Sequence, residues 1–444
     1  MESVLLYLLG IVIVLVGLIV SIGLHEVGHL VPAKLFGVRV TQYMIGFGRT
    51  IWSRRKGETE YGVKMIPLGG YISMIGMFPP KQPGGAARNA STGFFDTLVQ
   101  DAREASADTI GAGDEERTFY RLPVWKRIVV MLGGPFMNLV LAVLFIGIAV
   151  SGFGVPQQSS TLTSVYECVL PSTSDRQSCA AGDPQGPAAA AGLKPGDTIL
   201  SIDGTPISTF AEISAAVQDS PGKPLALEVA RGEQRLDLTL TPLLLERDVV
   251  DAQTGKIVTN ADGSAKTHEV GFVGITPQQQ MVAQPVTTIL PTVGDTIART
   301  ANIILNLPQR LIDVGQAAFG SGERDPNGPM SVVGVGRVVG EVVSLDEIPV
   351  ASKAATVFGI LGSLNVALFV FNLIPLLPLD GGHVAAALWE AIRRRFAKVF
   401  RRRDPGPVDA AKLIPLTFGV VIVLGGMSAL LVYADIVKPV NLFG

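Results

Sequence analysis

Four long apolar runs dominate the hydrophobic pattern of this chain, and they lie at residues 4–24, 128–150, 354–379 and 413–433. A helix needs about 20 apolar residues to cross the hydrocarbon layer of a bilayer, so each run predicts a transmembrane helix. The first run has no basic residue before it and no small-residue cleavage site after it, unlike a secretory signal peptide. We therefore expect it to remain as a helix in a polytopic α-helical membrane protein of about four spans.

Residues 62–75 are also apolar, but glycines and a proline interrupt them too often for a helix. β-prone residues on both sides of the Pro67-Leu68-Gly69-Gly70 turn predict a hairpin or looped strand. Lipid cannot satisfy free backbone groups, so this membrane-associated β-element must be buried against helices or line a wet cavity. Residues 79–116 are rich in Pro, Gly, Ala, Ser and charge, which is typical of a mobile loop.

The region between the second and third runs has the shorter periodicities of an α+β domain. Its predicted elements are strands at 198–202, 225–230 and 236–241 and a helix at 210–218. Asp203-Gly204 marks a turn after the first of these strands, and residues 157–164, rich in Ser, Thr and Gln, are expected to be a linker. The module has about 90 residues, a size that can fold alone. Beyond it, the spacing of Ile and Leu over residues 277–319 predicts amphipathic helices.

Composition favours a membrane protein and argues against a nucleic-acid binder. Hydrophobic residues make up 48% of the chain, charged residues 17%, and the formal net charge is -2, so there is no global basic surface. Lys and Arg gather between the first and second runs and between the third and fourth, and such residues favour the cytoplasmic side. We expect a multi-pass protein of the cell membrane with cytoplasmic basic loops, and with both termini and the α+β domain outside.

The two cysteines, Cys168 and Cys179, fall in the region expected outside the cell, where oxidising conditions let a disulfide persist. If paired, they close a short loop and stabilise it by roughly 3 kcal/mol. Two unpaired thiols in a flexible linker are the alternative, because only the compartment supports pairing.

The motif His25-Glu26-Val27-Gly28-His29 lies at the inner end of the first run. On a helix, positions i and i+4 point the same way, so both imidazoles can bind one zinc ion while Glu26 takes a proton from water. Such motifs recur by chance, and these residues can also form the wet end of a helix. Ionisable residues within a span are costly and usually functional, which favours the zinc site.

A catalytic zinc needs a third protein ligand and an open position. Asp380 is the best candidate, since it ends the third run, which crosses the membrane in the same direction as the first. Pro375 and Pro378 loosen the helix before it, and Gly381 and Gly382 let the chain turn closely after it. A helix cap or an ordinary turn residue is the alternative interpretation of Asp380.

These motifs resemble those of the site-2 proteases, which are zinc intramembrane proteases, in the bacterial RseP-type branch with a PDZ insertion. The resemblance covers nearly the whole chain in the family's order. The PDZ part is carried by the run from Ala191 to Gly204, with Gly271 to Ile275 similar to a late strand or loop. Its other motifs are HEVGH, Gly37 to Val40, Ile45 to Gly48, Pro67 to Tyr71, Gly134 to Asn138, Gly328-Pro329 and Asn372 to Gly382.

The resemblance implies that His25, His29 and Asp380 bind Zn²⁺ and that Glu26 is the general base. Asn372 is similar to a residue thought to position the substrate, although hydrogen bonding between helices is an equal alternative for it and the better one for Asn138. Gly69, Gly70 and Tyr71 resemble the β-element that offers an edge to an unwound substrate. His383 is expected to be a neighbour of the site and not a ligand.

The implied activity is cleavage of transmembrane segments in single-pass membrane proteins, either anti-sigma factors or remnant signal peptides. The PDZ-like domain either binds a peptide or excludes bulky substrates by size, and a single such module is one departure from relatives with two. The rival hypothesis is a non-catalytic zinc-binding membrane adaptor or transporter, which would not need Glu26.

The expected domain boundaries follow the order of the chain. They are 1–36 for the first transmembrane helix with its HExxH motif, 37–123 for the cytoplasmic side with the β-loop, 124–152 for the second transmembrane helix, 153–276 for the extracytoplasmic linker and PDZ domain, 277–352 for extracytoplasmic amphipathic helices, 353–380 for the third transmembrane helix, 381–411 for a basic cytoplasmic segment, 412–436 for the fourth transmembrane helix and 437–444 for an extracytoplasmic tail.

Overall fold

Backbone contacts divide the protein into two compact units, one built from residues 1–154 and 283–444 and the other from Val155–Val282. Each unit is described by itself. The computed structural model describes residues 2–78, 101, 103, 105–111, 113–169, 178–180, 182–248, 267–320, 324–325, 328–346 and 348–440. The loop predicted at 79–116 therefore lies largely outside the described residues.

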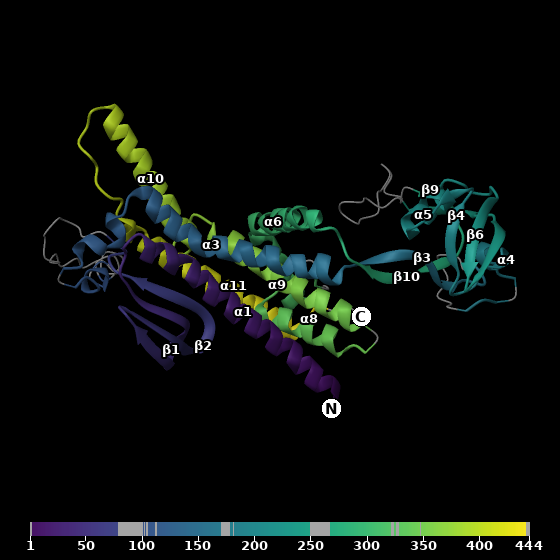
Figure 1. Cartoon of the computed structure of the whole chain (residues 1–444), viewed down its shortest axis with the longest axis horizontal. Helices are drawn as coiled ribbons and strands as arrows, with labels where there is room; N and C mark the ends of the chain where they lie inside the picture. Colours follow the sequence, from purple (N-terminus) through teal and green to yellow (C-terminus); the bar gives the residue numbers. More distant parts are fainter. Residues whose placement is uncertain are drawn as a thin grey trace. The chain divides into compact units, whose positions relative to one another are not determined.

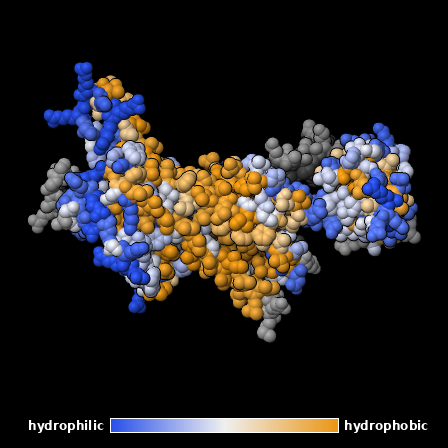
Figure 2. Space-filling model, in the orientation of Figure 1, coloured by the Kyte–Doolittle hydropathy of each residue, from blue (hydrophilic) through white to orange (hydrophobic). Residues whose placement is uncertain are grey.

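The first unit is a bundle of helices whose surface in Figure 2 is broadly hydrophobic. Within the described residues, 4 helices are long and apolar enough to cross a membrane, as the four apolar runs predict. They are α1 (Glu2–Leu35), α3 (Val124–Gly147, extended by a π-turn over Ile148–Phe153), α9 (Val350–Asn372) and α11 (Ile414–Val437). In Figure 1, α3 lies against both α1 and α9, so it is central to the bundle.

The third long helix is shorter than its apolar run. It ends at Asn372, and residues 373–379 form turns before α10 (Asp380–Val399) begins. The physical cause is the pair Pro375 and Pro378, since proline lacks the N–H of a helix interior and disfavours helical backbone in the residue before it. Asp380 is thus the first residue of a new helix instead of the last residue of a span.

Shorter helices complete this unit, namely α6 (Ile289–Leu305), α7 (Leu307–Phe319) and α8 (Val332–Ser344). The amphipathic helices predicted after residue 277 are present, but they begin later, because residues 277–282 belong to a strand. Arg127 of α3 forms an ion pair of 2.5 Å with the fully buried Glu390 of α10. This pair ties α10 to α3.

A long β-hairpin packs beside the inner part of α1, formed by β1 (Val40–Lys56) and β2 (Thr59–Met74). The chain reverses at Gly57, whose φ of +65° suits glycine. It reverses again between Val63 and Gly70, as the turn expected at Pro67 to Gly70 predicts. Because of this second reversal, the two halves of β2 pair with the same part of β1. Met44, for example, faces both Gly62 and Tyr71.

The hairpin is buried against helices, as the cost of free backbone groups in lipid predicts. Tyr43 donates a hydrogen bond of 2.8 Å to the carbonyl oxygen of Gly23 in α1. Val40 and Met74 share a buried cluster with Leu30 of α1 and Val130 of α3. The second reversal leaves the segment from Gly70 to Met74 at one edge of the sheet, paired only with Val40 to Ile45 within the described strands.

The second unit is built around a sheet with the order β10-β3-β4-β6-β7, with β5 added on β4 and a separate pair β8-β9. The bounds are β3 (Val155–Val165), α4 (Pro187–Ala190), β4 (Thr198–Ile202), β5 (Thr205–Pro206), α5 (Phe210–Gln218), β6 (Leu225–Arg231), β7 (Gln234–Leu240), β8 (Leu243–Asp248), β9 (Thr267–Phe272) and β10 (Ile275–Val282). Ile199, Ile213 and Leu227 lie in its buried core.

The local predictions for this unit are confirmed at α5, β4 and the β6-β7 hairpin, where hydrophobic periodicity was the guide. The expected linker at residues 157–164 is wrong. These residues form β3, which pairs along its length with β10 more than a hundred residues later in the chain. The polar composition gave no indication of a strand. The backbone N–H and C=O groups of a strand are satisfied by the neighbouring strand, whatever the polarity of its own side chains.

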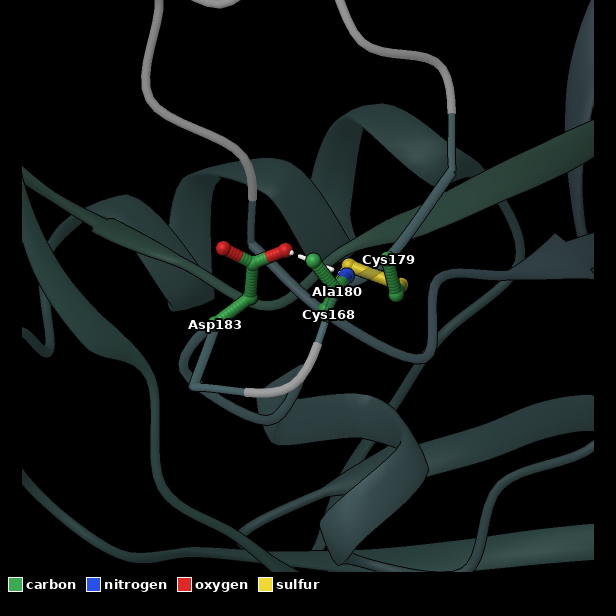
Figure 3. Close-up of a disulfide and its surroundings, with 4 residues drawn as sticks. All are labelled: Cys168, Cys179, Ala180 and Asp183. Carbon is green, nitrogen blue, oxygen red and sulfur yellow. Dashed lines mark hydrogen bonds between the residues drawn. A yellow bond between two sulfur atoms is a disulfide. The ribbon is translucent and has the colours of Figure 1, made fainter.

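Cys168 and Cys179 form a disulfide, which Figure 3 shows beside the hydrogen bond of 2.7 Å from the Ala180 N–H to the Asp183 carboxylate. The expected pairing is therefore present. The bond closes a loop between residues 11 apart in the sequence.

Candidate metal centre

The two imidazoles of the HEVGH motif lie one turn apart on a continuous stretch of α1. Their Nε2 atoms are 3.2 Å from each other and so face a common point. The side chains are largely withdrawn from solvent, with 12% of His25 and 6% of His29 exposed. The helical spacing therefore produces a pair of nitrogen donors.

Asp380 completes this group from the start of α10. Its Oδ2 atom lies 3.3 Å from the Nε2 atoms of both His25 and His29. Oδ2 is also buried without a hydrogen-bond partner, which is costly for a carboxylate unless a cation is present. Two imidazoles and one carboxylate are a donor set of catalytic zinc sites, so these residues fit zinc.

The glycines after Asp380 have a clear structural role. A Cβ on Gly381 would lie 2.4 Å from the Ile374 carbonyl oxygen, and one on Gly382 would lie 2.5 Å from the Leu377 nitrogen. The turn after α9 therefore folds directly onto the start of α10. This close approach of backbone brings Asp380 back to the inner end of α1.

Glu26 lies beside the three possible ligands and is 9% exposed. The edge of the hairpin packs against it, since a Cβ on Gly70 would be only 3.0 Å from Glu26 Cγ. The backbone of Ile72, two residues further along this edge, also lies close to the Glu26 carboxylate. A titratable side chain is thus held between the metal-binding group and a strand edge.

Helix α3 lies behind both imidazoles. His29 Nδ1 is 2.8 Å from the Val130 carbonyl oxygen, and His25 Nδ1 is 3.0 Å from the Asn138 side-chain nitrogen. Between them, Gly134 leaves space, because a Cβ there would be 2.2 Å from His29 Nε2. The contact of Asn138 joins α3 to α1, as the expected hydrogen bonding between helices predicts. The roles of Val130 and Gly134 were not predicted, and for Val130 no signal was available because a carbonyl is common to every residue.

The other expected site residues have different places. Gly69 packs on Phe47, and Tyr71 donates a hydrogen bond of 3.1 Å to the Gln42 side chain, so both lie on the hairpin outside the ligand cluster. Asn372 is the half-buried last residue of α9. In the described parts of the chain, no hydrogen bond or ion pair joins it to the three ligands.

His383 lies one turn after Asp380 and contacts Phe78, with ring centroids 6.5 Å apart. Burial lowers the pKa of His383, so its imidazole is neutral near pH 7. His383 is thus a neighbour of the cluster in sequence.

Comparison with known proteins gives one family and several similar full-length proteins. The model of peptidase family M50 matches residues 13–403. The chain is 33% identical to zinc metalloprotease Rip1 of Mycolicibacterium smegmatis over 449 residues, which cover 98% of this chain and 99% of that protein. It is 30% identical to Rip1 of Mycobacterium tuberculosis over 441 residues, covering 99% and 100%. Metalloprotease MmpA of Caulobacter vibrioides is 28% identical over 400 residues, covering 87% and 89%.

Proposed function

The chain belongs to peptidase family M50, the site-2 protease family of zinc metalloproteases, and from this premise we propose that it cleaves the transmembrane segments of single-pass membrane proteins. The family membership favours an enzyme over a non-catalytic zinc-binding adaptor or transporter. The finer proposal concerns the substrate, the general base and the orientation in the membrane.

The position of Glu26 between the ligand cluster and the hairpin edge carries the proposal. The segment from Gly70 to Met74 has one side without a strand partner in the described part of the sheet. An extended peptide can bind there by adding a strand, which satisfies its backbone groups inside the membrane. A substrate helix opened in this way would lie with its peptide bonds close to Glu26.

The chemistry then divides between the ligands and the base. When bound, zinc supplies a Lewis acid that polarises the scissile carbonyl and activates water at neutral pH. His25, His29 and Asp380 would hold it and leave one position open. Glu26 accepts the proton of the attacking water and donates a proton to the leaving amine. Gly70 orients Glu26 by close packing.

Asn372 is proposed to contact the substrate backbone. It ends α9 at the start of the turn that leads to Asp380, and its amide can both donate and accept hydrogen bonds. An Asn372 variant that loses substrate affinity and keeps its zinc would support this role. Loss of helix packing alone would lower thermal stability instead.

The proposed orientation follows from the charge of the loops. Basic residues flank the inner ends of α1 and α3 and continue along α10, for example Arg393 to Arg395 and Arg401 to Arg403. This favours a cytoplasmic position for the hairpin and α10. The unit from Val155–Val282 and both termini would then be extracytoplasmic.

This extracytoplasmic unit is proposed to be a PDZ-like domain. It has a pocket of about 330 Å³ lined by α5 and the chain from Val270 to Ile275, including Phe210, Ile213 and Phe272. Such a cleft between a helix and a strand suits an extended peptide end. The domain can also exclude substrates that still carry a bulky external part. Anti-sigma factors trimmed outside the membrane and remnant signal peptides are the proposed substrate classes.

The test is cleavage of a single-span substrate by the full-length protein in detergent. Wild type is expected to cut the trimmed substrate, a chelator to stop cleavage and added zinc to restore it. Glu26→Gln is expected to retain zinc and lose cleavage by at least about 10²-fold, the size of a general-base contribution. Equal cleavage by wild type and Glu26→Gln would refute the mechanism.

Glu341→Gln is the matched control. Glu341 is a half-buried carboxylate on α8, paired with Arg337 at 2.6 Å and remote from the cluster in sequence and contacts. The Glu341→Gln variant should cut the substrate at the wild-type rate. If it lost activity as Glu26→Gln does, the loss of cleavage would reflect removal of any partly buried carboxylate.

A further inference from the structure

The two nitrogens of the His25 ring face different partners. Nε2 faces His29 and Asp380, which leaves Nδ1 directed away from the ligand cluster. Nδ1 lies 3.0 Å from the side-chain amide of Asn138 on α3. Asn138 is fully buried, at 0% exposure, so no bulk water competes for this contact.

A neutral imidazole that binds metal through Nε2 carries its proton on Nδ1, and that N–H needs an acceptor. Asn138 has one acceptor, Oδ1, which is buried without a hydrogen-bond partner. The amide presents its nitrogen to His25 Nδ1. A half turn of the amide exchanges its oxygen and nitrogen and places the oxygen against Nδ1.

We propose that Asn138 is a positioning residue for the zinc site, whose side-chain oxygen accepts the Nδ1–H of His25 and so holds this imidazole ready to bind metal through Nε2. His29 already has the equivalent arrangement, because its Nδ1 is 2.8 Å from the Val130 carbonyl oxygen. Each histidine ligand therefore has its own acceptor on α3.

The spacing along α3 supports this role. Val130, Gly134 and Asn138 are four residues apart, so they share one helix face. Val130 meets His29, Asn138 meets His25, and Gly134 between them leaves room beside both Nε2 atoms. Since His25 and His29 are themselves four residues apart, one face of α3 matches one face of α1.

The competing interpretation is that Asn138 only links two helices by a hydrogen bond. Asn365 on α9 offers the comparison, because it is also fully buried and donates to the Ser21 side chain of α1 at 3.0 Å. It also donates to the Leu361 carbonyl oxygen at 2.9 Å, and its own Oδ1 is buried without a partner. It contacts neither histidine in these bonds, so it isolates the cost of losing a buried asparagine.

The experiment measures zinc affinity of the full-length protein in detergent by competition with a chromogenic chelator, without any substrate. Asn138→Leu keeps the shape of the side chain and removes the acceptor, and it should weaken zinc binding by about 10- to 100-fold. Asn138→Asp keeps an acceptor oxygen and should bind zinc within about threefold of wild type. Asn365→Leu should bind zinc as wild type does, with a lower thermal stability.

A spectrum gives a second measurement that packing alone would not change. In the cobalt-substituted protein, Asn138→Leu should alter the visible absorption bands of the ion, whereas Asn365→Leu should leave them unchanged. If Asn138→Leu does not fold, Asn138→Ala replaces it in both measurements.

Three outcomes would overturn the proposal. These are wild-type zinc affinity in the leucine or alanine variant, equal loss of affinity in Asn365→Leu, or failure of Asn138→Asp to restore binding. Because no substrate is used, these outcomes are independent of whether the protein cleaves transmembrane segments.

Discussion

Gly28 on α1 and Gly133 on α3 meet without any side chain between them. A Cβ on Gly133 would lie 2.0 Å from the Gly28 carbonyl oxygen, and one on Gly28 would lie 2.2 Å from that of Gly133. Small residues let helices in membranes approach this closely. The contact lies between His25 and His29 in the sequence of α1, so it brings α3 directly behind both imidazoles.

Gly134→Ala should abolish zinc binding. The new methyl group would lie 2.2 Å from His29 Nε2 and 2.7 Å from His25 Nε2, and on a helix it cannot move away. We expect the zinc content after gel filtration to fall below about one tenth of wild type, since ligand distances tolerate only about 0.2 Å. Gly425→Ala on α11 is the control, because the added Cβ would have no atom of another part of the protein within 4 Å, and it should retain full zinc. A stoichiometric zinc content in Gly134→Ala would contradict this.

Gly70→Val should lower activity while leaving the metal in place. Even a Cβ would lie 3.0 Å from Glu26 Cγ and 3.1 Å from Ile22, so the larger side chain must displace the strand edge or the carboxylate. A shift of about 1 Å near the reacting groups can reduce kcat/KM about 100-fold. Steady-state cleavage and zinc content measure the two effects separately.

The control for that change is Met65→Val on the same strand, where the side chain is exposed. It should cut at nearly the wild-type rate. Normal cleavage by Gly70→Val would show that the hairpin edge does not control Glu26.

Stability of the second unit should fall in acid because of Asp197. Burial alone would raise the pKa of the Asp197 carboxyl, but hydrogen bonds of 2.8 Å from Arg231 and from the Lys194 backbone hold the pKa below its usual range. The folded state thus binds this proton less readily than the unfolded state. The stabilisation is present above an unfolded pKa of about 3.9 and is lost as pH falls through the lower folded pKa.

The measurement is thermal unfolding of the fragment 155–282, whose ends pair as Val155 with Val282. Between pH 5 and pH 2.5 we expect Asp197→Asn to lose about 1 kcal/mol less stability than wild type, the size typical of a partly exposed pair. Substitution of the exposed Asp237 by Asn should leave the pH dependence of stability as it is in wild type. If the stability of wild type and of Asp197→Asn fell equally with pH, the proposed contribution of the Asp197–Arg231 pair would be contradicted.

The disulfide should stabilise the same fragment. Cys168 and Cys179 are 11 residues apart, and closing a loop of that size removes entropy from the unfolded chain worth about 3 kcal/mol. Reduction should therefore lower Tm, and the double variant Cys168→Ser with Cys179→Ser should have the reduced Tm with or without reductant. An unchanged Tm on reduction would show that the bond contributes nothing.

Short-range patterns predicted much of what is local. The spacing of His25 and His29 depends only on the helix repeat, and the strand pair β6-β7 follows from alternation on both sides of a glycine turn. The hairpin beside α1 shows the limit, since the residues predicted the reversal at Pro67 to Gly70 but not the one at Gly57. How the two reversals combine into one sheet depends on the strand pairing, in which Met44 faces both Gly62 and Tyr71.

The four apolar runs, the pair of histidines one turn apart in the first of them, and Asp380 as a possible third ligand could all be predicted from local patterns in the chain. The part that α3 plays in this site became visible only once the helices were packed, through the Val130 carbonyl, the missing side chain of Gly134 and the buried amide of Asn138. The physical reason is that a backbone oxygen, an absent side chain and an asparagine have no distinctive pattern along the chain. Their function arises from the surface that α3 presents to α1.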